Sequence, residues 1–172
     1  MSQQTQNLMK KISLAKVVLN MGVGKSGEPI EIGKKTLVQI TGKKPNERNA
    51  KKSQRDWGVR KGEPIGIAVT VRGNDATELL KKLLVVKDNQ IAEKAFDNEG
   101  NLSFGIKEHI DIPGIKYDPK IGILGLEVSI SLARPGFNIK FNKSKAKVGK
   151  NHRITKNDAI KFLTEEFGVK VV

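Results

Sequence analysis

Residues 124–132 spell Leu-Gly-Leu-Glu-Val-Ser-Ile-Ser-Leu, a strict alternation of large apolar residues with small or polar ones. Successive side chains of a strand point to opposite faces, so this stretch predicts a strand with one core face and one bare face. Residues 14–21, 67–72 and 102–107 follow the same alternation. Antiparallel sheets can leave one face in water, whereas parallel sheets rarely do. The pattern therefore predicts a mostly antiparallel sheet with an open face.

Helical patterns lie between and after these strands. Pro29 suits a first helical turn, and Asp75 and Glu78 have the spacing of a capping box. Thr155 and Asp158 predict a further cap near the end of the chain. The order β-α-β-α-β-β predicts an α+β fold, with helices packed on one face of the sheet in a single domain over residues 1–172. The predicted helices cover residues 29–42, 76–84, 87–96 and about 155–167.

Positive charge is concentrated in parts of the chain. The 32 Lys and Arg outnumber 18 Asp and Glu, which gives a formal net charge of +14. Residues 43–66 form a basic excursion, predicted as a hairpin with little core. Residues 134–153 form a basic arm without acids, with too few large apolar residues to predict packing. Basic runs separated by an acid-bearing middle indicate a protein with one side on a polyanion, and the open sheet face is predicted to take RNA.

The open face has the chemistry for ribose and phosphate contacts. Alternation assigns Leu14, Lys16 and Asn20 of the first strand to it, and Thr70 and Arg72 of the second. The face is predicted to carry no aromatic ring on which a base could stack. Hydrogen bonds from Asn20 and Thr70, with charge neutralisation by Lys16 and Arg72, would suit a folded RNA surface.

Other functions find weak support. Gly24-Lys25-Ser26 resembles part of a phosphate-binding loop, but Leu19 stands where the first glycine is required. A membrane-surface role for the arm lacks an amphipathic stripe. His109 and His152 are far apart and predicted to face solvent or RNA, so no metal site is expected. Without cysteine, signal peptide or membrane span, a cytoplasmic protein with no catalytic group and no cofactor is expected.

Six segments, in order along the chain, carry a family resemblance: LNMGVG at 19–24, TGKKP at 41–45, AKKS at 50–53, GVRKGEPIG at 58–66, VTVRG at 69–73 and FGIKEHI at 104–110. Together they resemble the large-subunit ribosomal protein five family, whose members hold 5S ribosomal RNA (rRNA) in the central protuberance. The resemblance covers nearly the whole chain in order. The basic arm resembles the archaeal and eukaryotic branch, through RPGF at 134–137 and HRI at 152–154.

The resemblance implies a structural, non-enzymatic role in the ribosome, with contacts to large-subunit rRNA and neighbouring large-subunit proteins. For 5S rRNA, the predicted contacts are Lys16, Asn20, Met21, Lys43, Lys44, Thr70 and Arg72. A loop expected to reach the transfer RNA (tRNA) in the peptidyl site carries Lys51, Lys52, Arg55, Trp57, Arg60 and Lys61. A bridge to a small-subunit protein is expected at Pro113, Gly114, Lys116, Tyr117 and Asp118.

Overall fold

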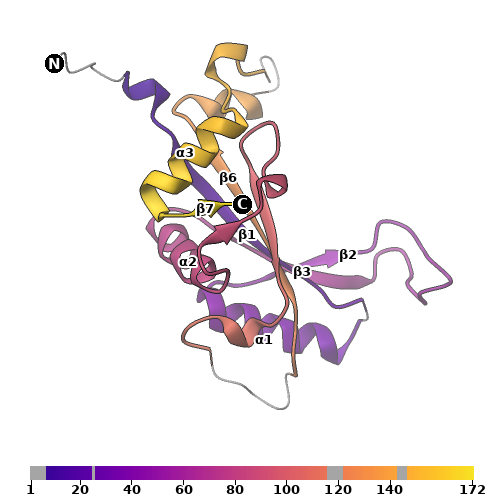
Figure 1. The fold of residues 1–172 in the computed structure, drawn as a ribbon. Coiled ribbons are helices and arrows are strands. Elements are labelled where there is room, and N and C mark those ends of the chain that lie inside the picture. The colour runs from indigo at the N-terminus through magenta and orange to yellow at the C-terminus, as the bar shows by residue number, and fades with distance from the viewer. Residues whose placement is uncertain (1–6, 25, 116–121, 143–146) are drawn as a thin grey trace.

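Five strands form an antiparallel sheet at the centre of the structure, in the order β2-β3-β1-β6-β5 (Figure 1). The computed structural model describes residues 7–24, 26–115, 122–142 and 147–172. A small second sheet pairs β4 with β7 in parallel. The strands are β1 Ser13–Gly22, β2 Asn46–Asn49, β3 Pro64–Val71, β4 Gln90–Ile91, β5 Leu102–Ile106, β6 Leu126–Ala133 and β7 Lys170–Val171.

Three α-helices share one apolar core with the inner face of the sheet. Leu37, Leu80 and Leu163, one from each helix, are fully buried with Val17 and Val128 of the sheet. The predicted α+β fold is confirmed, and burial of these side chains supplies its main driving force. The helices are α1 Glu28–Thr41, α2 Asn74–Val85 and α3 Lys156–Phe167, with short 3-10 turns at η1 Leu8–Lys10, η2 Glu93–Ala95, η3 His109–Asp111, η4 Phe137–Phe141 and η5 Lys150–His152.

The ends of α1 and α3 follow the sequence signals. Pro29 lies in the first turn of α1, and Gly42 ends that helix in the left-handed conformation (φ 64°). At α3, the Thr155 side chain accepts from the Asp158 backbone, and the Asp158 side chain accepts from the Thr155 backbone. Both predicted boundaries are confirmed.

One predicted helix cap and one predicted helix are wrong. Asp75 does not cap α2, because the N-cap is Gly73, which has no side chain to cap with, and Asp75 already lies in the first helical turn. There its carboxylate pairs with Lys43 at 2.6 Å. Residues 87–96 do not form a helix. The chain turns through Asp88 and Asn89, which have φ of 52° and 55°, into β4 and η2. Pairing of β4 with the distant β7 overrides the local helical pattern there.

A β-bulge changes which face of β1 its first residues occupy. Leu14 pairs with Leu132 and Lys16 pairs with Ser131, so Ala15 is an extra residue in the strand. A single inserted residue reverses the alternation. Leu14 therefore packs against the core, and its assignment to the open face is wrong.

His109 serves the fold, which corrects the prediction that it faces solvent or RNA, whereas His152 remains partly exposed. His109 is 1% exposed, and its Nδ1 accepts a hydrogen bond from the Leu124 amide at 3.3 Å. His152 Nε2 lies 2.8 Å from the Pro135 carbonyl oxygen. Since a carbonyl oxygen only accepts, Nε2 carries the proton.

The basic arm also packs, contrary to the expectation from its composition. Val148 is buried, and Phe137 packs against the core partly buried. Ile154, directly after the arm, is 2% exposed. A few well-placed apolar residues thus hold the described parts of the arm, residues 134–142 and 147–153, against the rest of the protein.

We expect Asp158→Asn to lower stability near neutral pH and to flatten its loss in acid. Burial alone would raise the pKa of Asp158, but hydrogen bonds from Thr155 and the charge of Arg134 lower it below its usual value. A carboxylate with a lowered folded-state pKa stabilises the fold above its unfolded pKa, and that contribution is lost as pH falls. Urea unfolding midpoints between about pH 3 and pH 7 measure this. An unchanged pH profile in the variant would contradict the assignment.

Candidate nucleic-acid interface

Strand register brings small and polar side chains into rows across the open face. Val18 of β1 lies opposite Thr70 of β3 on one side and Ser129 of β6 on the other. Ser103 of β5 continues the row beside Ser129. Residues directly opposite one another share a face with Cβ atoms about 5 Å apart. Four strands thus contribute one residue each to a row that contains no large side chain.

A second row carries the polar centre of the face. Asn20 lies between Ala68 and Glu127, and Gly105 follows on β5. The Asn20 Nδ2 donates to Glu127 Oε2 at 3.4 Å, and Glu127 is exposed. Sequence reasoning did not select Glu127 as a site residue, although alternation placed it on this face. Its carboxylate can accept hydrogen bonds but cannot neutralise phosphate.

Cations stand at the margins of these rows. Lys16 is half-buried opposite Ser131, and Arg72 is exposed directly after β3. Arg48, which sequence reasoning did not select, lies opposite Gly66 and shares the open face. Register, rather than composition, identifies it. The open face, defined here by these rows and cations, therefore combines hydrogen-bonding groups with positive charge.

Met21 does not belong to this surface. Its side chain is 1% exposed, and an added Cβ on Gly33 of α1 would lie 3.4 Å from its Sδ. The side chain faces the core because it alternates with Asn20. A side-chain contact between Met21 and RNA, as expected from the resemblance, is thereby excluded.

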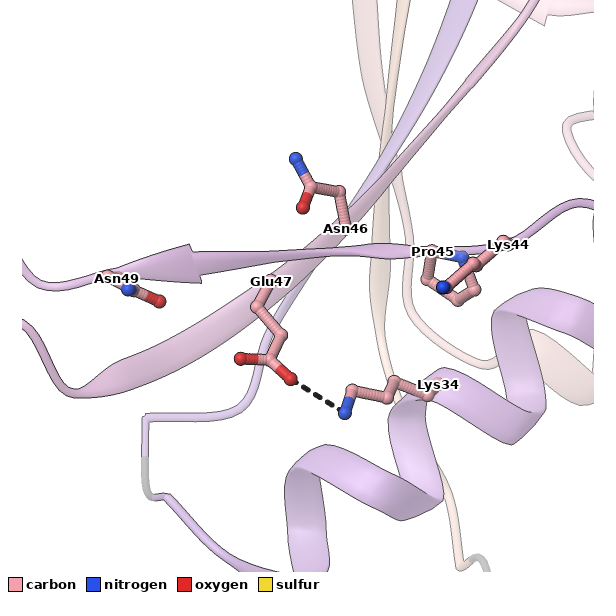
Figure 2. A pocket seen from close by; sticks show the side chains of 6 residues that line it. All are labelled: Lys34, Lys44, Pro45, Asn46, Glu47 and Asn49. Carbon is pink, nitrogen blue, oxygen red and sulfur yellow. Dashed lines mark ion pairs between the residues drawn. The ribbon is translucent and has the colours of Figure 1, made fainter.

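The remaining predicted cations, Lys43 and Lys44, lie between α1 and β2. Lys43 is paired with Asp75, while Lys44 borders a shallow pocket beside Asn46 (Figure 2). In that pocket the Lys34 ammonium lies 2.6 Å from Glu31 and 2.7 Å from Glu47.

Those two ion pairs decide what the pocket can bind. The hydrogen bonds that the Lys34 ammonium donates, to Glu31 first and then to Glu47, raise the pKa of Lys34. Figure 2 shows Glu47 turned toward α1 and Asn46 turned away from it. Because carboxylates already satisfy Lys34, the pocket fixes β2 against the helix and is a poor phosphate site.

The basic excursion is a hairpin built from β2 and β3, as predicted. Toward its tip Gln54 pairs with Val59, and Lys61 donates its amide to the Ser53 hydroxyl at 2.9 Å. Trp57 is 76% exposed, so it does not cover a local apolar cluster, one of the two roles considered for it. All six cationic or aromatic residues predicted for tRNA lie along this hairpin: Lys51, Lys52, Arg55, Trp57, Arg60 and Lys61, each of them exposed.

Glu63 connects the base of this hairpin to the turn between β1 and α1. One carboxylate oxygen accepts from the Ser26 hydroxyl at 2.5 Å, and the other accepts from the Arg60 amide at 2.9 Å. The hydrogen bond from Ser26 first, and that from Arg60, lower the pKa of Glu63. The hairpin is thereby oriented relative to the sheet.

The same turn is not a phosphate-binding loop. The amides of Val23 and Gly24 both donate to the Ile65 carbonyl, at 3.0 and 2.9 Å. Ser26 donates to Glu63, and Lys25 lies outside the described residues. A phosphate cradle needs free amides and a free hydroxyl, which these groups do not offer.

The predicted bridge loop is described only at its start. Pro113 and Gly114 are exposed after η3, whereas Lys116, Tyr117 and Asp118 lie outside the described residues. Within the described ranges, no group of three metal-ligating residues occurs. No helix among the same residues is long and apolar enough to cross a membrane.

Comparison with known proteins gives one consistent result. Residues 7–60 match the family described as ribosomal protein L5, and residues 64–162 match the C-terminal part of the same ribosomal family. The large ribosomal subunit protein uL5 of Nitrosopumilus maritimus is 64% identical over 172 residues, which cover 99% of each chain. The uL5 proteins of Pyrobaculum aerophilum and Sulfolobus acidocaldarius are 46% and 45% identical, over 95% and 97% of this chain and 92% and 94% of theirs.

Proposed function

Because this chain belongs to the ribosomal protein uL5 family, as a non-enzymatic structural protein of the large subunit, we propose that its open face binds 5S rRNA. In this role Asn20 and Thr70 hydrogen-bond to ribose or phosphate, and Lys16 and Arg72 neutralise phosphates. The chain helps to attach 5S rRNA in the central protuberance.

One observation carries the proposal, namely the bare four-strand surface on a chain of net charge +14. The helices of the domain pack on the other face, so this face stays accessible to a large, flat ligand. Small side chains allow close approach of a folded RNA backbone, and the absence of rings on the described rows leaves no stacking platform. Shape and charge together favour RNA recognition through the backbone.

Two further contacts belong to the proposal. The hairpin tip reaches the tRNA in the peptidyl site, with Trp57 available to stack on a nucleotide and Arg55 and Arg60 available for phosphates. The loop at Pro113 and Gly114 meets a small-subunit protein at the bridge between subunits. Exposure of these residues supports both contacts.

Filter binding of 5S rRNA across a salt series tests the main contact and separates it from the hairpin. Replacing residues 54–60 by two glycines is expected to leave 5S binding within about threefold, because the rows of the open face are untouched. The same variant, assembled into large subunits, is expected to show reduced tRNA occupancy of the peptidyl site.

Failure of the unchanged chain to bind 5S rRNA would refute the proposed function. Loss of 5S binding only on the hairpin replacement would instead place the hairpin in the main interface. A natively folded variant, checked by circular dichroism, is the condition for both measurements.

A further inference from the structure

The two ends of the basic arm are tied together by hydrogen bonds and one ion pair. Arg134 Nη1 donates to the Arg153 carbonyl at 3.1 Å, while Nη2 lies 3.1 Å from Asp158 Oδ2. The Arg134 side chain is only 11% exposed. His152 donates to the carbonyl of Pro135, the residue after Arg134. These contacts close the arm into a loop at its base.

Inside the loop, side chains hold its two halves against each other. The rings of Phe137 and His152 pack edge to face with centroids 5.6 Å apart. Val148 is 6% exposed, and its carbonyl accepts from Arg153 Nε at 3.3 Å. Lys140 lies over the Phe137 ring at 5.1 Å. The described part of the arm, residues 134–142 and 147–153, is therefore folded in the protein alone.

Two exposed lysines in the described part of the arm have no carboxylate partner among the described residues, whereas Lys140 pairs with Glu99 at 3.6 Å. Residues 128–157 contain no acid. Lys147 and Lys150 are exposed, and no carboxylate of the described residues lies within ion-pair distance of either. Lys43, by contrast, is paired with Asp75. Cations without carboxylate partners create a local positive potential, and this potential attracts a polyanion.

We propose that the described part of the arm is a second RNA-binding site, folded before RNA arrives, which takes a sugar-phosphate backbone. It lies beyond the end of β6, whereas the tRNA-directed hairpin extends from β2 and β3 (Figure 1). Since its backbone is already ordered, binding does not pay the entropy of folding a loop. This inference rests on the arm's own contacts and not on the assignment of 5S rRNA to the open face.

The test uses two double variants. The arm variant combines Lys147→Ala and Lys150→Ala, and the control variant combines Lys81→Ala and Lys82→Ala on α2. Both pairs remove two exposed charges. Binding to 5S rRNA and, separately, to large-subunit rRNA is measured across a salt series. We expect the arm variant to lower the slope of log affinity against log salt by about 1–2, and the affinity about tenfold, for at least one RNA.

The RNA that responds identifies the source of the backbone. A loss confined to large-subunit rRNA means that the chain joins two RNAs, and a loss confined to 5S rRNA means that the arm extends the same footprint. Equal behaviour of arm and control variants on both RNAs would overturn the site. If the unchanged chain fails to bind 5S rRNA while the arm effect on large-subunit rRNA persists, only the open-face function fails.

Amide hydrogen exchange on the free protein tests whether the arm is folded in advance. The His152 amide donates to the Gly149 carbonyl at 3.0 Å and is expected to be protected without RNA. Exchange at the rate of an unstructured peptide would refute the pre-folded site.

Discussion

A double variant, Thr70→Ala with Arg72→Ala, is expected to bind 5S rRNA roughly 2–4 kcal/mol more weakly, at about 1–2 kcal/mol for each lost contact. That range corresponds to roughly a 30- to 1,000-fold loss of affinity. The Thr70 substitution removes a hydroxyl from the row that spans four strands, and the Arg72 substitution removes a positive charge at the margin of the open face. Neither side chain is buried, so the fold is expected to persist.

The matched control replaces a threonine and a cation on the helical side. Thr77→Ala with Lys81→Ala on α2 likewise removes one hydroxyl and one positive charge, away from the open face. We expect this control to bind 5S rRNA within about twofold of the unchanged chain, apart from a small non-specific charge effect. Equal binding by both double variants, with intact circular dichroism, would remove the open face from the interface.

The largest expected effect on stability is that of Gly100→Ala. Gly100 is buried with φ +76°, and an added Cβ would lie 2.5 Å from Ile154 Cγ2 and 3.2 Å from Ile154 Cβ. Those atoms adjoin the backbone, so Ile154 cannot relieve the overlap by a rotation at its far end. Left-handed strain and overpacking together are expected to cost about 2–4 kcal/mol of unfolding free energy.

Gly42→Ala separates the two causes. Gly42 has φ +64°, and an added Cβ would meet nothing within 4 Å. This variant carries the conformational strain alone and is expected to cost about 1 kcal/mol. Urea unfolding of both variants measures the difference. If Gly100→Ala cost no more than Gly42→Ala, the packing of Ile154 against this turn would be disproved.

The inner and outer faces of the sheet were predictable in strands where apolar residues alternate strictly with small or polar ones. β6 alternates without exception, so its outward Ser129 and Ser131 were placed from sequence. β1 was harder, because its apolar residues also occur in adjacent pairs such as Leu14 and Ala15, which hide a bulge. Only pairing with β6 shows the bulge, and pairing is a property of the folded chain.

Features that depend on distant contacts were missed for the same reason. β4 is two residues long and exists through its partner β7, so its own sequence carries no strand signal. The basic arm was not predicted to pack, because it has few large apolar residues. Its described part is held by hydrogen bonds from Arg134 and His152 to carbonyl groups 17 or 19 residues away along the chain.

The candidate interface was predictable in kind but not in membership. Alternation located the open face, and the resemblance named Asn20, Thr70 and Arg72. Register was required to bring Arg48 onto the same face, and burial was required to remove Met21. The alternation of side chains along each strand is enough to predict that an open polar face exists. Which residues make up that face depends on which strands lie side by side, and this is known only from the structure.

The most direct test of whether RNA binds the open face is site-directed cleavage from introduced cysteines, which is possible because the chain has no cysteine of its own. A tethered iron chelate on Ser103→Cys, at the open face, and on Lys82→Cys, on α2, generates hydroxyl radicals at two known places. With the RNA-bound protein we expect strand scission of 5S rRNA from position 103 and none from position 82. Scission from position 82 alone would show that RNA rests against the helices and leaves the bare side of the sheet unoccupied.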